Sequence, residues 1–574
     1  MENSPQLGQK YSNFGSNSEK KSFPKTLEEH SLSLRKKKNN RQRNYILPPE
    51  LISDFSYKID LSEIELRIKD NQLYIQFINS TSQKDSLSFL FQMLLIDSDD
   101  MIKFSISKIR DFLVNIDDKI FKEKNYMEEF NDKFIIFLFD LMFKKANDYS
   151  LLINISFILS KLAIFLTAKN NYFFEILLKN FSNILNLVKN IGTDEPKIKN
   201  LLYLLTEKIF LSSDDMIKNL EQNCPNYITQ IHAEINNLDE KKFVKNMALI
   251  STLIQIINNC FFSHIYSNYF FAPMNNNSNN EINAENIIKF VQKLLNYSYQ
   301  IEILELELSC IQNFLYFFME SEGLFSNKIL KKKVQNMIYD LELEKKIVPM
   351  IYDSTVNEAD LRRIAVQILI NATYICPKKF CEKLVENNIS EQITKLENFL
   401  ISQTQFTNRL KHLYILLLDL IHNLIENESS DIIDNLTIEN NCISLLFKLQ
   451  KIHFYSKEIK PMIKIFNILI SSNHKYIQTL LISEGICELY KSFLENEPSN
   501  DEIEIMINNF LSMVKYSENF MKEKNGDNMD HNSLLIHLEK IGVFEVVNNL
   551  KSRNELSNKV ISAINEFTSL INHK

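Results

Sequence analysis

Residues 360–400 read DLRRIAVQILINATYICPKKFCEKLVENNISEQITKLENFL and contain a three-helix pattern from which the rest of the chain can be interpreted. The first part carries apolar residues at a helical period: Leu361, Ile364, Ala365, Ile368, Leu369 and Ala372. This spacing predicts one apolar stripe on a helix of about 3.6 residues per turn. The pair Cys376-Pro377 ends the helix, because proline disfavours helical backbone in the residue before it.

Two further helices are predicted in the same stretch. Pro377 suits the first turn of a helix, where its missing N–H is no loss. The apolar face of this short helix is Phe380, Leu384 and Val385. Asn388 ends it, since Asn tolerates the left-handed conformation. The next helix has Ile389, Ile393 and Leu396 on one side. Three helices of this size in about forty residues are typical of an armadillo or HEAT repeat.

A Gly or Asn followed by apolar positions recurs at the corresponding point of several segments. The positions are Gly323, Asn388, Asn441, Gly485 and Gly542, at steps of 65, 53, 44 and 57 residues. The steps exceed the roughly 40–47 residues of a bare unit, so we expect repeats with loop insertions. The chain has only seven glycines, and three of them occupy this point. The alternative is an ordinary irregular helical domain.

The length favours a solenoid over one compact domain. A single hydrophobic core rarely exceeds about 250–300 residues, and this chain has 574. Seven glycines and eleven prolines are too few for a loop-rich β protein. We predict an all-α fold, a right-handed armadillo-type (ARM/HEAT-like) α-solenoid. It is expected to span residues 51–574 in roughly ten units, with the last unit at about 533–570.

The first fifty residues differ in composition from the rest. They hold ten Lys/Arg and five Asp/Glu, whereas the whole chain has a formal charge of −7. They lack a sustained apolar face, so we predict that residues 1–50 are a disordered basic tail. Within this tail, residues 27–47 are expected to form a basic helix on an acidic partner surface. A plain solubilising tail is the alternative.

No pattern for catalysis, metal binding or membrane insertion occurs. The chain lacks a Gly-rich phosphate loop, G-x-S-x-G and H-E-x-x-H, so no enzyme activity is expected. The seven cysteines are scattered without a C-x-x-C pair, which predicts reduced, mostly buried thiols rather than a zinc site. The sequence predicts no cofactor. It also predicts no signal peptide and no membrane span, because no apolar run reaches about 18 residues.

Several segments together resemble importin-α, the armadillo-repeat adaptor of nuclear import. Leu34-Arg35-Lys36-Lys37-Lys38, followed by Arg41-Gln42-Arg43-Asn44, is similar to that family's importin-β-binding segment, with a shorter spacer. Residues 94–117 resemble the helix pair that opens the family's repeats. Residues 370–389 match a late repeat, and residues 538–567 the last one. The matches follow the family's order along nearly the whole chain.

The resemblance implies a nuclear import adaptor that shuttles between cytoplasm and nucleus. Its partners would be an importin-β-type carrier and cargo proteins with nuclear localisation signals. The residues implied in carrier binding, and in folding back into the cargo groove, are Leu34, Arg35, Lys36, Lys37, Lys38, Arg41 and Arg43. A plain nuclear-localisation or nucleic-acid patch is the alternative. Only Tyr45 lies nearby, which argues against nucleic-acid stacking.

The cargo groove departs from the family. In the importin-α family the long helices carry the motif Trp-x-x-x-Asn. The Trp rings hold the methylene stem of a cargo Lys, and the Asn amide holds the cargo backbone. This chain has no Trp. Its matching pairs are Gln367 with Asn371, then Phe157 with Lys161 and Leu204 with Lys208.

The two lysines at the amide position would repel a basic peptide. We therefore expect ordinary Lys-rich signals to bind weakly, mostly near Asn371, and real cargo to use an atypical motif. For Asn371 the alternative is an ordinary solvent-facing or capping residue. For the whole chain the alternative is a cytoplasmic, non-transport armadillo scaffold.

Overall fold

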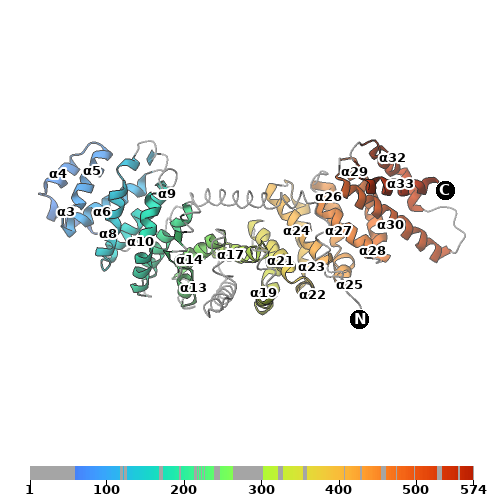
Figure 1. Cartoon of the computed structure of the whole chain (residues 1–574), viewed down its shortest axis with the longest axis horizontal. Coiled ribbons are helices and arrows are strands. Elements are labelled where there is room, and N and C mark those ends of the chain that lie inside the picture. The colour runs from blue at the N-terminus through green and yellow to red at the C-terminus, as the bar shows by residue number, and fades with distance from the viewer. Residues whose placement is uncertain are drawn as a thin grey trace. The chain divides into compact units, whose positions relative to one another are not determined.

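The computed structural model describes residues 59–572 with gaps. The gaps are 117–119, 122–125, 167–171, 193–194, 213–215, 217–218, 221–222, 225–226, 238–245, 263–300, 321–327, 353–358, 406, 427–429, 454–459, 473–474, 497, 526–532 and 554–555. Within the described ranges every regular element is a helix. The chain divides into two compact units, Met1–Phe290 and Val291–Lys574. Figure 1 labels the helices of both.

The second unit repeats a group of three helices. After α17 (Ile301–Glu320), the groups are α19 (Lys328–Asp340), α20 (Leu343–Ile351) and α21 (Ala359–Ile375); α22 (Pro377–Glu386), α23 (Ile389–Ser402) and α24 (Asn408–Glu426); α25 (Ser430–Asp434), α26 (Cys442–His453) and α27 (Lys460–Ser471); α28 (Lys475–Glu484), α29 (Ile486–Leu494) and α30 (Asn500–Asn525); and α31 (Ser533–Lys540), α32 (Val543–Leu550) and α33 (Asn558–Asn572). A π-helical turn, Asn435–Glu439, follows α25. We call the members of a group its first, second and third helix.

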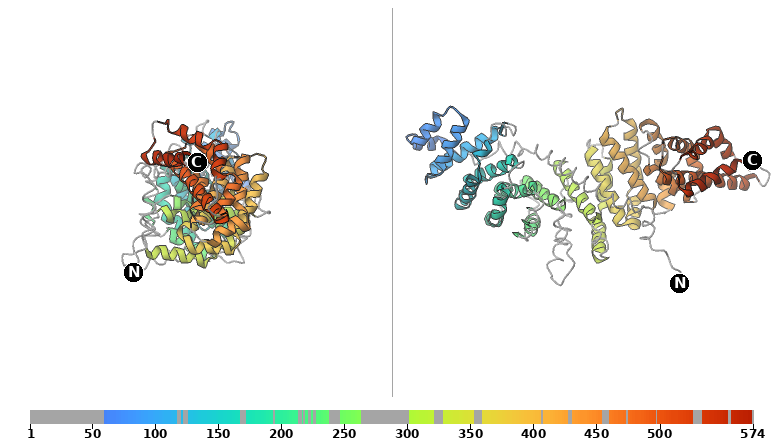
Figure 2. Two further views of the ribbon diagram at one scale, coloured as in Figure 1. Left: turned by 90° about the vertical axis from the view of Figure 1, so that its right-hand side faces the viewer. Right: turned by 45° about the horizontal axis from the view of Figure 1, so that its top comes forward.

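Third helices of successive groups pack against one another. The row runs α17, α21, α24, α27, α30 and α33. Second helices of successive groups also contact one another: α20 contacts α23, α23 contacts α26, and α29 contacts α32. The order of these helices along the second unit is visible in Figures 1 and 2. Because each group packs on its neighbours in sequence, the unit is an all-α solenoid, as the helical periodicity predicts.

The predicted three-helix stretch is confirmed in detail. The helices are α21, α22 and α23, and Pro377 occupies the first turn of α22. The predicted apolar positions Phe380, Ile389, Ile393 and Leu396 are fully buried. Proline thus ends α21 and begins α22 at the point that the sequence indicates.

The turn between first and second helix has left-handed backbone in every group of the second unit. Its φ is 46° at Glu342, 60° at Asn388, 55° at Asn441, 97° at Gly485 and 79° at Gly542. Four of these five residues were predicted from the recurring Gly or Asn. Gly323 lies outside the described residues, and the group that ends with α21 uses Glu342 instead. Glutamate carries no sequence signal for this conformation, which costs a residue with a Cβ about 1–2 kcal/mol.

The first unit has the same kind of row. Its helices are α3 (Leu61–Ile68), α4 (Gln72–Ile78), α5 (Gln83–Leu94), α6 (Asp99–Asn115), α8 (Asp132–Lys144), α9 (Tyr149–Leu166), α10 (Tyr172–Asn190), α11 (Pro196–Glu207), α13 (Tyr227–Asn237) and α14 (Met247–Phe262). Short 3₁₀ turns lie at Tyr126–Glu128 and Lys208–Leu211. The packed row is α3, α6, α9, α11 and α14. Residues 94–117, which resemble the opening helix pair of the importin-α repeats, cover the last residue of α5 and the whole of α6, with Ser98 at the N-cap of α6.

Exposed ion pairs join neighbouring helices at the start of this row. Arg67 of α3 pairs with Asp100 of α6 at 2.8 Å, and Lys108 of α6 pairs with Glu65 of α3 at 3.4 Å. Such surface pairs contribute about 0–1 kcal/mol each, so apolar burial holds the row together. The seven cysteines are all buried, and none of them forms a disulfide bond, as predicted. Among the described helices, none has the length and apolar character needed to cross a membrane.

Candidate functional site

Third helices of the second unit have one exposed side. The helices α21, α24, α27 and α30 each pack between the preceding and the following helix of the row, and other helices of the stack cover a further side. The uncovered side forms what we call the third-helix stripe. Its residues are Gln367 and Tyr374 on α21, Asp419 and His422 on α24, Lys464 and Asn467 on α27, and Asn508, Ser512 and Lys515 on α30. On each helix these residues are three, four or seven positions apart, which is the spacing of one helix face.

Two neighbouring helices present side-chain amides on this stripe. Asn467 is half-buried on α27, and Asn508 is exposed on α30. Within the described part of the chain neither amide has a hydrogen-bond partner. An Asn amide offers both donors and an acceptor, which is what the backbone of an extended peptide requires. The two residues therefore form a candidate contact for a bound chain.

The stripe has charges of both signs. Asp419 is its carboxylate, and its Lys515 on α30 pairs with Glu566 of the neighbouring helix α33 at 3.4 Å. Lys464 adds an exposed positive charge on α27. Because the stripe carries Lys464 and Lys515 as well as Asp419, it does not present the uniformly negative field that attracts Lys-rich peptides.

Asp419 is the half-buried carboxyl group of the stripe. Burial raises its pKa above the ordinary value, while the positive charges of His422 and Lys464 act in the opposite direction. Among the described residues, none forms a hydrogen bond or a close ion pair with the Asp419 carboxylate. A desolvated carboxylate of this kind gains from a ligand donor more than an exposed one does.

The structure places Asn371 in the interior. Its side chain is 1% exposed. Its Oδ1 accepts a hydrogen bond from Gln367 Nε2 at 3.0 Å, and its Nδ2 donates to the backbone carbonyl of Gln312 on α17 at 3.3 Å. The amide expected to hold cargo instead joins two neighbouring third helices. Asn423 does the same one helix later, where its Nδ2 donates to Thr373 Oγ1 at 3.0 Å.

The other expected groove residues lie in the first unit and are also mostly covered. Phe157 is fully buried on α9, so it is a core residue in place of the expected surface aromatic. Leu204 is half-buried on α11. The Lys161 ammonium lies 5.9 Å from the centre of the Phe165 ring, and Lys208 Nζ pairs with Glu207 at 2.9 Å. The structure therefore does not bring these four side chains together on an open face.

Burial around α9 explains this placement. Residues 151–160 of α9 are all buried, because α6 and α11 pack on the helix as well as α8. A helix that is apolar all round has no periodic signal to mark which side faces a groove. The sequence pattern alone could not distinguish Phe157 as core from Phe157 as ligand contact.

Polar side chains of α11 are likewise used inside the first unit. Lys199 pairs with Glu234 at 2.7 Å, and Asn200 accepts a hydrogen bond from Thr252 at 2.6 Å. Asn259 of α14 donates to Glu207 at 2.8 Å. These buried bonds stabilise the packing of α11 against α13 and α14, and they leave few polar groups for a partner.

The carrier-binding prediction stays a prediction. Leu34, Arg35, Lys36, Lys37, Lys38, Arg41 and Arg43 lie outside the described residues. No group of three or more His, Cys, Asp or Glu residues suited to a metal ion occurs within the described ranges.

Comparisons with known proteins bear on the fold. No family model matches the chain, and no curated protein matches it. A chain from a structural study titled "A conserved phosphorylation switch controls the interaction between cadherin and beta-catenin in vitro and in vivo" is similar, with a TM-score of 0.55 and 10% sequence identity. The match covers 89% of this chain and 94% of that one.

This chain has an armadillo/HEAT-type solenoid fold. Two further solved structures match at lower TM-scores. Importin beta has a TM-score of 0.37 with 10% identity, covering 92% of this chain and 57% of that chain. SYS-1 has a TM-score of 0.35 with 11% identity, covering 89% of this chain and 99% of that chain. At 10% identity the match described first, with a TM-score of 0.55, supports the fold alone.

Proposed function

We propose that this protein is an adaptor that holds an extended segment of a partner protein against the third-helix stripe of its second unit. The observation that carries the proposal is the pair of amides Asn467 and Asn508, on adjacent helices and without a partner in the described structure. The adjoining Asp419 would select a donor-bearing side chain. No catalytic activity, metal or cofactor is part of the proposal.

We further propose that the basic segment with Arg35–Lys38, Arg41 and Arg43 binds an importin-β-type carrier. In that case the adaptor delivers cargo with atypical localisation signals and shuttles between cytoplasm and nucleus. The support is the resemblance of this segment to the importin-β-binding segment. The mixed charge of the stripe agrees with cargo that is not simply Lys-rich.

A non-transport scaffold is the second candidate. The internal use of Asn371 and the burial of Phe157 favour it, because both remove expected contacts for a localisation signal. A scaffold would use the same stripe but would not depend on the basic segment. The two candidates therefore differ in the role of residues 1–50.

The stripe is tested by selecting peptides on the full-length protein from a displayed random library. A selected peptide is then titrated against the Asn467→Ala/Asn508→Ala double variant. Losing two amide contacts of about 1 kcal/mol each should weaken binding roughly tenfold to thirtyfold. Asn548→Ala, an exposed Asn of α32 away from the stripe, is the matched control and should bind as the wild type does. Equal affinity for all three proteins would refute this use of the stripe.

A further inference from the structure

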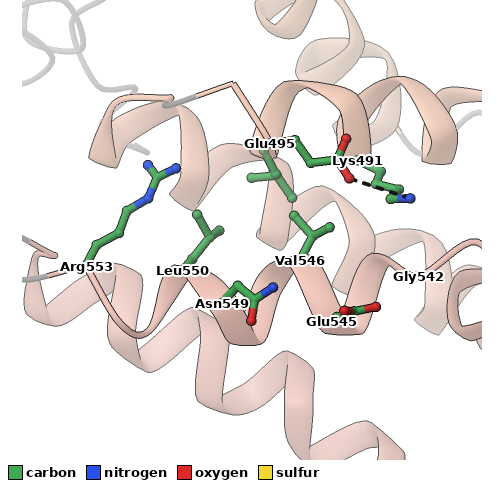
Figure 3. Close-up of a pocket in the computed structure, with 9 residues that line it drawn as sticks. Lys491, Glu495, Gly542, Glu545, Val546, Asn549, Leu550 and Arg553 are labelled. Carbon is green, nitrogen blue, oxygen red and sulfur yellow. Dashed lines mark ion pairs between the residues drawn. The ribbon is translucent and has the colours of Figure 1, made fainter.

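A groove lies between the second helices of the last two groups, α29 and α32. Its volume is about 350 Å³. Lys491, Leu494 and Glu495 of α29 line one side, and Gly542, Glu545, Val546, Asn549, Leu550 and Arg553 line the other (Figure 3). None of these residues belongs to the third-helix stripe, so the groove is a separate feature of the second unit.

The groove has a small apolar centre within a mainly polar lining. Val546 and Leu550 are one turn apart on α32, and Leu494 is contributed by α29. Leu494 and Leu550 are buried, whereas Val546 is half-exposed and offers a surface to a ligand. This centre suits one apolar side chain rather than a large aromatic ligand.

Charged groups lie on both sides of this centre. On the α29 side, Lys491 and Glu495 pair with each other at 3.6 Å. On the α32 side, Glu545 and Arg553 have no ion-pair partner among the residues that the structure describes. Glu545 lies in the first turn of α32, and Arg553 lies three residues beyond its last residue, so the negative and the positive group lie at opposite ends of this helix (Figure 3). Asn549 lies between them, exposed and with its side-chain amide without a described partner.

We propose that this groove binds a linear peptide of the pattern basic–x–apolar–x–acidic. In an extended chain, residues four apart are about 13 Å apart and point to the same side. The basic side chain then reaches Glu545, the apolar one covers Val546, and the acidic one accepts hydrogen bonds from the Arg553 guanidinium. Asn549 supplies a donor and an acceptor for the peptide backbone between them. A purely acidic or purely basic peptide leaves one of the two charges unmatched.

The probe is the fluorescein-labelled, amidated peptide Gly-Lys-Ser-Leu-Ser-Asp-Gly, titrated by anisotropy against the full-length protein. Two comparison peptides carry Lys at both charged positions or Asp at both. A third omits the second Ser, which places the two charges on opposite sides of an extended chain. Wild-type protein should prefer the Lys/Asp peptide over all three by about tenfold.

Charge reversal supplies the decisive comparison. The Arg553→Glu variant should bind the Lys/Asp peptide about tenfold more weakly than the wild type does, and it should bind the Lys/Lys peptide more tightly. The Glu545→Lys variant should bind the Asp/Asp peptide more tightly than the wild type does. Lys540→Glu, an exposed residue at the end of α31 outside the groove, should behave as the wild type. Thermal unfolding of each variant checks that it is folded. The proposal is overturned if the wild type shows no saturable binding at millimolar peptide, or if the two reversals leave the preference unchanged. Because the stripe variants at Asn467 and Asn508 leave this groove intact, the result is independent of the proposed function.

Discussion

Gln367 donates a hydrogen bond from its side-chain amide to Asn371 Oδ1 at 3.0 Å, and Asn371 donates in turn to the backbone carbonyl of Gln312 at 3.3 Å. This relay links α21 to α17 through a buried side chain. The same two residues, four apart, are the positions at which a cargo contact was expected. In this solenoid the pair holds two third helices together.

Asn371→Ala should therefore weaken the packing of α17 on α21 rather than remove a surface contact. Loss of a buried hydrogen-bonding group costs about 1–3 kcal/mol, because the Gln367 amide and the carbonyl of Gln312 would each lose a partner. The expected result is faster amide hydrogen exchange in both helices, measured by mass spectrometry on the full-length protein. Asn508→Ala is the control, since its amide is exposed and should not change exchange in α17 or α21. Unchanged exchange together with lost peptide binding would instead restore Asn371 as a ligand contact.

The left-handed turns give a second prediction. Gly485→Ala should destabilise the second unit by about 1–2 kcal/mol, because a Cβ disfavours this backbone conformation. An added Cβ would also lie 3.3 Å from Glu488 Oε2. Gly192→Ala is the control, since no atom lies within 4 Å of the added Cβ and no positive φ is required there. Urea unfolding followed by circular dichroism measures both. Equal effects of the two substitutions would contradict the role of the turn.

Glu342 allows the same argument in reverse. Its φ of 46° is unfavourable for a residue with a Cβ, so Glu342→Gly should remove this strain. The gain is offset by lost interaction with Lys345 and by the greater freedom of glycine in the unfolded chain. We expect the free energy of unfolding, measured in urea, to change by less than about 1 kcal/mol for Glu342→Gly, whereas Gly485→Ala should lower it clearly. A loss as large as that of Gly485→Ala would show that the left-handed turn at Glu342 is not strained.

The recurring turn shows how far the sequence predicts this fold. Pro377, Asn388, Gly485 and Gly542 could be placed because their signals are local and depend on backbone geometry alone. Glu342 could not, since glutamate carries no local signal for left-handed backbone. The candidate site was harder to predict. Asn371 lies on the polar side of its helix by sequence period, yet contact with α17 buries it.

A buried carboxyl group makes stability depend on pH. Glu307 of α17 is 1% exposed, and neither of its carboxyl oxygens has a hydrogen-bond partner within the described structure. Burial raises the pKa of Glu307 to about 8. The folded state therefore binds this proton more tightly than the unfolded state, so its contribution to stability is present at acidic pH and is lost as pH rises through about 8.

Glu307→Gln should remove this dependence, because the amide cannot ionise. As pH rises from 6 to 8, ionisation of Glu307 should lower the free energy of unfolding of the wild type by at most about 1.4 kcal/mol per pH unit. The free energy of unfolding of the variant should fall less over the same range. Urea unfolding at pH 6, 7 and 8 measures the difference. Glu305→Gln, on the same helix, is the comparison for changes that do not involve Glu307. If the free energy of unfolding changed with pH in the same way for the wild type and for Glu307→Gln, a buried, neutral Glu307 would be contradicted.

The basic segment separates the transport adaptor from the scaffold. Replacing Arg35, Lys36, Lys37, Lys38, Arg41 and Arg43 with Ala should abolish capture of an importin-β-type carrier at physiological salt, because the attraction is electrostatic. The matched control replaces Lys10, Lys20, Lys21 and Lys25, which lie in the same tail outside the segment. Retained capture by the six-residue variant would favour the scaffold.

The most direct measurement of the central claim is the site at which a selected peptide cross-links to the full-length protein. The peptide carries one photoreactive residue, and the cross-linked positions are identified by mass spectrometry. A peptide held by the third-helix stripe should cross-link to residues of α24, α27 and α30, around Asp419, Asn467 and Asn508. Cross-links confined to the first unit, or to second helices such as α29 and α32, would contradict the third-helix stripe as the binding site of the selected peptide.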